Sequence, residues 1–133
     1  MNPLERARIL IVEDATDIRD VFSLLLRAEG ANVTATGSGR EAVEITTARN
    51  FDVLLTDLGL PDVPGHVLIR HVTADALRRP WIVVLTGYGE PFLAQARQAG
   101  ADVVLTKPVT WQVLVHQLVP RPALGGPSPS DRC

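Results

Sequence analysis

Five short apolar runs recur in this sequence, and four of them are followed closely by polar side chains that could take part in chemistry. Glu13 and Asp14 follow the first run, Asp57 the third, Thr86 the fourth and Lys107 the fifth. Taken alone, Asp57 is also typical of a turn or a helix cap, and Thr86 of a helix cap. The five residues together favour one shared site, because convergent polar groups at a crevice are typical of function.

The carboxylates of Glu13, Asp14 and Asp57 are predicted to need a cation if they lie together. Two unit charges about 4 Å apart interact by roughly 4 kcal/mol at an effective dielectric of about 20, and between carboxylates this interaction is repulsive. Oxygen ligands with room for water suit Mg²⁺. Neither the single cysteine, Cys133, nor a spaced pair of histidines is placed to ligate a softer metal. The sequence therefore predicts a Mg²⁺ site.

Lys107 and Thr86 indicate what that metal would face. Lysine supplies a compact positive charge, and threonine supplies a hydroxyl donor. An anionic group is expected between the Mg²⁺ and the lysine, and this arrangement stabilises a phosphoryl group during its transfer. Asp57 is then the predicted nucleophile, which forms an aspartyl phosphate.

These side chains must be positioned by regular elements, and the apolar runs are typical of β-strands. The runs are RILIV at 8–12, NVTAT at 32–36, DVLLT at 52–56, WIVVL at 81–85 and DVVLT at 102–106. Three of them lack the alternation of a half-exposed strand, which indicates burial on both faces. Strands that alternate with helices predict a doubly wound α/β sandwich with a parallel sheet, whose ligand site lies at the carboxyl ends of the strands.

Five helices are predicted between and after these runs. The first has an apolar face with helical spacing, made by Ile18, Val21, Phe22 and Leu25, and Gly30 stands where its C-cap is expected. Weaker patterns cover 39–49, 65–78 and 90–99. The last helix repeats the apolar spacing through Trp111, Leu114, Val115 and Leu118, and Pro120 ends it because proline has no amide hydrogen.

Four motifs, taken in order, resemble the receiver domain of two-component response regulators. They are VED at 12–14, TDLGLPDVPG at 56–65, LTGYG at 85–89 and TKP at 106–108. The resemblance spans about residues 6 to 119, and LTGYGE is also similar to receivers of hybrid sensor histidine kinases. It implies a flavodoxin-like (βα)5 fold with strand order 2-1-3-4-5 and a role in a phosphorelay.

The resemblance also implies a role for each acidic residue. Asp57 would accept a phosphoryl group from the phosphohistidine of a sensor histidine kinase or a histidine phosphotransfer domain. Asp14 and Asp57 would bind Mg²⁺ through their side chains, and Gly59 through its backbone carbonyl. Glu13 would contribute directly or through water.

Lys107 would pair with one phosphoryl oxygen, and Thr86 would hydrogen-bond another. The bond between Lys107 and Pro108 is a candidate for the cis geometry common in the family. In family members, the threonine at the position of Thr86 and an aromatic residue three positions before the lysine change conformation together on phosphorylation. In this chain Val104 occupies the position of that aromatic residue. We therefore expect a different or smaller output change.

Other functions fit these residues less well. A phosphatase of the haloacid dehalogenase type places a second aspartate two positions after its nucleophile, where this chain has Gly59, so turnover of a separate substrate is not expected. A nucleotide-binding or flavin-binding module lacks support, because neither a Walker lysine loop nor a G-x-G-x-x-G motif follows the first strand. A receiver-like module that acts in protein interaction without phosphorylation is the remaining alternative.

Length and composition favour one domain, which we place at residues 6–119, with a flexible Pro/Gly-rich tail at 120–133. The net charge of −2 does not favour direct binding to nucleic acid or to an anionic membrane. Without a signal-peptide layout or an apolar run of roughly 18 residues, we expect a cytoplasmic location and no membrane insertion. A weak homodimer is compatible with the sequence.

Tyr88 lies two residues beyond Thr86, at the expected mouth of the site. It either controls the access of water to the phosphoryl group or packs as an ordinary aromatic side chain. His66, His71 and His116 are expected to be structural or surface residues, because they lie far along the chain from the acidic residues.

Overall fold

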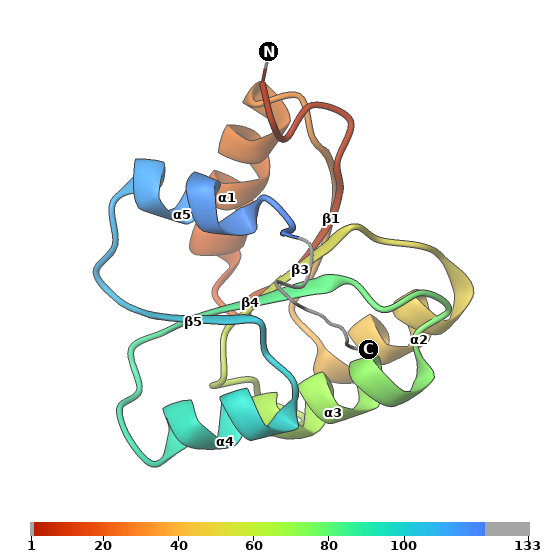
Figure 1. Cartoon of the computed structure of the whole chain (residues 1–133), viewed down its shortest axis with the longest axis vertical. Helices are drawn as coiled ribbons and strands as arrows, with labels where there is room; N and C mark the ends of the chain where they lie inside the picture. The colour runs from red at the N-terminus through yellow and green to blue at the C-terminus, as the bar shows by residue number, and fades with distance from the viewer. Residues whose placement is uncertain (1, 122–133) are drawn as a thin grey trace.

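The computed structural model describes residues 2–121, which form a five-stranded parallel sheet between two layers of helices (Figure 1). The strands are β1 (Arg8–Val12), β2 (Asn32–Thr36), β3 (Val53–Thr56), β4 (Trp81–Thr86) and β5 (Val103–Thr106). Their order across the sheet is β2-β1-β3-β4-β5, which confirms the predicted flavodoxin-like fold. Strand order reverses between β1 and β3, so the ligand crevice of such a sheet is expected at their carboxyl ends.

The helices divide between the two faces of the sheet (Figure 1). One face is covered by α1 (Thr16–Ala28) and α5 (Trp111–Leu118), and the other by α2 (Gly39–Ala48), α3 (Gly65–Asp75) and α4 (Phe92–Ala99). Successive side chains of β3 point to opposite faces of the sheet. Leu54 packs with α2, α3 and α4, and Leu55 packs with α1 and α5. Burial on both faces explains why the central strands are apolar without alternation.

The first two strands have the predicted bounds, and the other predicted element ends differ from the observed ones by at most three residues. The third helix ends at Asp75 instead of residue 78, because the amide of Leu77 donates to the carbonyl of Thr46 at 2.8 Å and the chain turns toward α2. The fourth helix begins at Phe92 instead of residue 90, just after a cis bond between Glu90 and Pro91 that the sequence did not predict.

The apolar face predicted for the first helix is only partly the face that packs on the sheet. Val21 is 52% exposed, and Ile18 and Leu25 are 38% exposed, whereas Leu26 and Ser23 are buried. Leu24, Leu25 and Leu26 are consecutive, so apolar residues lie on several sides of this helix and their spacing does not select one side. The exposed residues form an apolar surface along α1.

Within residues 2–121, no helix is both long enough and apolar enough to cross a bilayer. Most of the predicted tail, residues 122–133 with Cys133, lies outside the described residues.

Candidate functional site

Asp57 lies directly after β3, whose four residues are all buried. The amide of Asp57 donates to the carbonyl of Val12 at 3.2 Å, which ties it to the end of the neighbouring strand β1. Its Oδ1 accepts hydrogen bonds from the amides of Leu58 at 2.6 Å and Gly59 at 3.4 Å. The carboxylate therefore has a fixed orientation at the carboxyl edge of the sheet, with its side chain 17% exposed.

Lys107, 50 residues further along the chain, contacts the carboxylate of Asp57. Its Nζ lies 3.2 Å from Asp57 Oδ2 and 3.9 Å from Glu13 Oε1. Its amide donates to the carbonyl of Thr86 at 2.8 Å, which places the lysine beside the end of β4. The bond between Lys107 and Pro108 is cis, as predicted. One ammonium group thus faces two of the predicted acidic residues.

Glu13 and Asp14 occupy different environments at the end of β1. Glu13 is 7% exposed, and its Oε2 accepts a hydrogen bond from the amide of Ala15 at 3.0 Å. Asp14 is exposed. Arg19, on α1, donates through Nη1 to the carbonyls of Glu13 at 2.8 Å and Asp14 at 3.4 Å. The backbone of this acidic pair is therefore held by a residue that sequence reasoning did not identify.

Whether Mg²⁺ fits can be judged from the donors at this edge. Within residues 2–121, no three His, Cys, Asp or Glu side chains lie close enough to hold a metal by themselves. Mg²⁺ commonly takes only one or two carboxylates and keeps several waters, so a smaller set is sufficient. The carboxylates of Asp57 and Glu13 both lie near the ammonium of Lys107, and the exposed residue Gly59, two positions after Asp57, has a backbone carbonyl as a further candidate donor. These oxygen donors fit Mg²⁺ better than a softer metal.

Thr86 is fully buried at the end of β4, and its Oγ1 accepts a hydrogen bond from the amide of Tyr88 at 3.1 Å. The phenol of Tyr88 lies against Gly59: a Cβ added to that glycine would stand 2.7 Å from the tyrosine oxygen. The ring of Tyr88 also packs against Phe92, with centroids 5.1 Å apart. The phenol of Tyr88 therefore lies next to Gly59, which is two residues from Asp57 in the sequence.

Asp62 is a second residue that sequence reasoning did not identify. It lies in the loop between β3 and α3, and its carboxylate accepts hydrogen bonds from Ser38, Gly39 and Arg40 at the start of α2. An aspartate in a segment rich in glycine and proline is typical of a turn, so its partners more than 20 residues away gave no signal in the sequence.

Val104 and the three histidines make no hydrogen bond or ion pair with Glu13, Asp14 or Asp57 within residues 2–121. Val104, on β5, is half-buried and packs with the core on the side of α2, α3 and α4. His71 and His116 are exposed, and His71 pairs with Asp75 at 3.6 Å on the surface of α3. His66 is half-buried at the start of α3.

The sequence matches a family model described as the response regulator receiver domain over residues 9–119. A curated relative, the cell cycle response regulator CtrA of Brucella ovis, is 31% identical over 112 residues, which cover 84% of this chain and 48% of CtrA. The chain thus spans about half the length of the curated relatives that it matches.

Two solved structures are similar in fold. The receiver domain of sensor histidine kinase PA1611 from Pseudomonas aeruginosa PAO1, with magnesium in its active-site cleft, is 28% identical with a TM-score of 0.74, over 85% of this chain and 97% of that one. A response regulator from Burkholderia pseudomallei, with a phosphorylated aspartic acid, calcium and citrate, is 26% identical with a TM-score of 0.77, over 84% of this chain and 66% of that one.

Proposed function

Since the chain belongs to the response regulator receiver domain family of two-component signalling, we propose that Asp57 accepts a phosphoryl group from a phosphohistidine. The donor is a sensor histidine kinase or a histidine phosphotransfer domain, and phosphorylation switches the contacts of this chain with its partners. The observation that carries the proposal is the pairing of Lys107 Nζ with Asp57 Oδ2 at 3.2 Å, beside the buried Thr86. We also propose that the chain is located in the cytoplasm, where it would meet this donor.

In the proposed transfer, a carboxylate oxygen of Asp57 forms a bond to phosphorus while the bond from phosphorus to the donor's imidazole nitrogen breaks. The electron pair of the broken bond remains on that nitrogen. The amides of Leu58 and Gly59 fix the carboxylate, and Lys107 neutralises negative charge on a phosphoryl oxygen. The hydroxyl of Thr86 can donate to another phosphoryl oxygen while it accepts from the amide of Tyr88.

We propose Asp14, Asp57 and the carbonyl of Gly59 as the protein ligands of Mg²⁺, with Glu13 acting directly or through water. The ion would neutralise phosphoryl charge opposite Lys107. The magnesium in the Pseudomonas receiver and the phosphorylated aspartate in the Burkholderia protein support this assignment. The chain assists its own phosphorylation and dephosphorylation, and no separate substrate is turned over.

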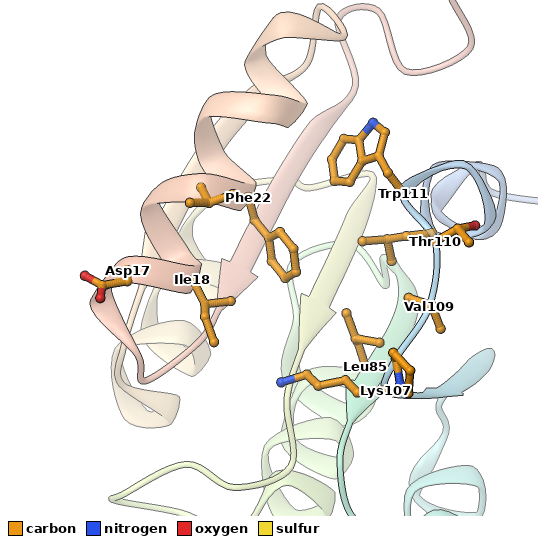
Figure 2. Close-up of a pocket in the computed structure, with 11 residues that line it drawn as sticks. Asp17, Ile18, Phe22, Leu85, Lys107, Val109, Thr110 and Trp111 are labelled. Atoms are coloured by element: carbon orange, nitrogen blue, oxygen red, sulfur yellow. The ribbon is translucent and has the colours of Figure 1, made fainter.

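The phosphohistidine donor is proposed to dock in the groove between α1 and the start of α5 (Figure 2). This groove has a volume of about 540 Å³ and is mostly apolar, with Ile18 and Phe22 on one side and Trp111 on the other. Lys107 belongs to both the groove and the site, so a partner seated in the groove lies beside Asp57. The exposed apolar residues of α1 extend the same surface.

Incubation of the whole chain with Mg²⁺ and acetyl phosphate tests the proposed function. We expect the wild type to gain the mass of one phosphoryl group, and Asp57→Asn to gain none because the nucleophilic oxygen is lost. Asp102→Asn is the matched control, since it removes one carboxylate next to β5 at the opposite edge of the sheet. Equal labelling of wild type and Asp57→Asn would contradict the proposal.

The alternative is a receiver-like interaction module that works without phosphorylation. It predicts no labelling of the wild type by acetyl phosphate or by any phosphorylated donor protein. The closeness of Lys107, Asp57 and Glu13 disfavours this alternative, because partner binding alone gives no reason to gather these groups at one strand edge.

A further inference from the structure

Residues 58–64, which follow Asp57 in the loop between β3 and α3, contain Gly59. A single side chain links these seven residues by hydrogen bonds to a distant segment. Asp62 accepts from the hydroxyl of Ser38 at 2.8 Å and from the amides of Gly39 and Arg40 at 3.0 Å each. In the described part of the chain, these are the only hydrogen bonds that join residues 58–64 to a distant segment. Asp62 therefore fastens this loop to the start of α2.

The loop and the start of α2 also pack closely. A Cβ added to Gly39 would lie 2.3 Å from Val63 Cγ2 and 3.3 Å from Leu60 Cδ1. Leu60 and Val63 in turn pack against the core shared by α2, α3 and α4. Glycine at position 39 is thus required for the loop to approach α2 as it does.

Within the loop, the backbone is braced at both ends. The amide of Gly65 donates to the carbonyl of Leu58 at 3.1 Å, and a Cβ on Gly65 would stand 2.5 Å from Leu58 Cα. At the other end, Asp57 Oδ1 holds the amides of Leu58 and Gly59. A loop braced in this way moves largely as one body, so a displacement at Asp62 is expected to reach Gly59.

We propose that Asp62 is a positioning residue, which fixes the carbonyl of Gly59 for Mg²⁺ through its hydrogen bonds to the start of α2. The inference rests on the proposed function, which makes Gly59 a metal ligand. In this arrangement Asp62 would touch neither the metal nor the phosphoryl group. It acts as the outer partner of a ligand, and loss of such a partner typically weakens metal binding by about 10-fold to 100-fold.

The ionisation of Asp62 is consistent with this role. Hydrogen bonds from the amide of Arg40, the hydroxyl of Ser38 and the amide of Gly39 hold the pKa of the Asp62 carboxyl well below its usual range. The carboxylate of Asp62 is therefore charged at neutral pH and can accept all three hydrogen bonds.

Binding of Mg²⁺ to the whole chain, measured by calorimetry, tests the inference without any phosphodonor. We expect Asp62→Ala to raise the Mg²⁺ concentration at half saturation by about tenfold. Asp62→Asn should fall between this variant and the wild type, because its amide group can retain part of the hydrogen bonding. Saturating Mg²⁺ should restore the wild-type rate of labelling by acetyl phosphate in both variants, since Asp57, Thr86 and Lys107 are unchanged.

Asp102→Ala is the matched control for stability. Asp102 accepts hydrogen bonds from the amide of Ile82 at 2.7 Å and from Arg79 at 3.0 Å, so it too joins distant segments, but at the opposite edge of the sheet. We expect this variant to unfold at a lower denaturant concentration while it binds Mg²⁺ like the wild type.

Gly39→Ala perturbs the same contact from the side of α2 and leaves Asp62 intact. Alanine favours the helix by its intrinsic propensity, yet its methyl group would displace Val63 and the loop. We expect this variant also to weaken Mg²⁺ binding, and it decides the question if Asp62→Ala does not fold.

Wild-type Mg²⁺ affinity in a folded Asp62→Ala variant would overturn the inference, whatever its stability. Wild-type affinity in Gly39→Ala would overturn it if Asp62→Ala does not fold, and a wild type that binds no Mg²⁺ would overturn it too. If the variants weaken Mg²⁺ binding but Asp57 is never phosphorylated, the positioning role stands and the proposed function fails.

Discussion

Lys107 contacts more of the proposed site residues than any other residue of the site. Its side chain faces Asp57 and Glu13, and its amide binds the carbonyl of Thr86, so three strands contribute to its surroundings. A point charge on a flexible stem can move from a carboxylate to a phosphoryl oxygen without rearrangement of the sheet. The proposed phosphoryl transfer therefore requires the side chain of Lys107 to move, but not the backbone of the sheet.

Two roles were considered for Tyr88: control of water access to the phosphoryl group, or packing as an ordinary aromatic side chain. Its contact with Gly59 favours control of water access. We expect Tyr88→Ala to lose its aspartyl phosphate up to about tenfold faster than the wild type, a change of ~1.4 kcal/mol in barrier, because water reaches the phosphorus more easily. The decay of phosphorylated protein, followed by intact mass after removal of the donor, measures this rate.

Tyr88→Phe is the control for that prediction, since it keeps the aromatic ring next to Gly59 and removes only the hydroxyl. Its phosphorylated form should decay close to the wild-type rate. An unchanged decay rate in Tyr88→Ala would show instead that the ring is an ordinary packed aromatic side chain.

At the scale of elements, the two edges of the sheet have different tasks. The carboxyl ends of the strands carry the residues of the proposed phosphoryl transfer, whereas the amino ends are held by ion pairs that join strands and loops. Asp52, just before β3, accepts from the amide and guanidinium of Arg8 and from Arg78 at 3.0 Å. Partial burial acts to raise the pKa of the Asp52 carboxyl, but the bonds and charges of Arg8, with the charge of Arg78, bring a net lowering.

This lowered pKa predicts how the contribution of Asp52 to stability depends on pH. A carboxyl with a lower pKa in the folded state stabilises fully above its unfolded pKa, about 3.8, and this contribution is lost as the pH falls through the folded value. We expect Asp52→Asn to be roughly 1 to 2 kcal/mol less stable than the wild type at pH 7, with a smaller difference at pH 3. Urea unfolding at both pH values measures it, and an equal difference at both would contradict the assignment.

At the scale of the whole molecule, the exposed apolar surface of α1 and its groove with α5 lie beside the site. Val21 is 52% exposed, so Val21→Asp should change the free energy of unfolding little and leave labelling by acetyl phosphate at the wild-type rate. Transfer from a phosphorylated histidine phosphotransfer domain that labels the wild type should become slower, because the charge would be desolvated when the donor docks.

Leu77→Asp is the control for the docking prediction. Leu77 is 60% exposed, but it follows α3 near the amino edge of the sheet, far from the groove. It should accept phosphate from the protein donor at the wild-type rate. Equal slowing in both variants would indicate a general effect of added charge and would remove the groove from the proposal.

The sequence by itself determined the strands, their order along the chain and the residues at their carboxyl ends. Parallel strands buried on both faces must be continuously apolar, so their positions are visible as short runs. Asp57, Thr86 and Lys107 each stand directly at the end of such a run, and a parallel sheet must bring those ends to one edge. The four motifs then added the family and the strand order.

Only the tertiary structure decided which side of α1 packs on the sheet, and which distant groups support the site. Because Leu24, Leu25 and Leu26 are consecutive, the sequence does not show which side of α1 faces the sheet. In the folded chain, the neighbouring strands and α5 bury Leu26, while Val21 stays exposed. Asp62 and Arg19 act on backbone groups, which every residue carries, so no residue type in the sequence identifies their partners. Contacts of this kind exist only once the chain has folded.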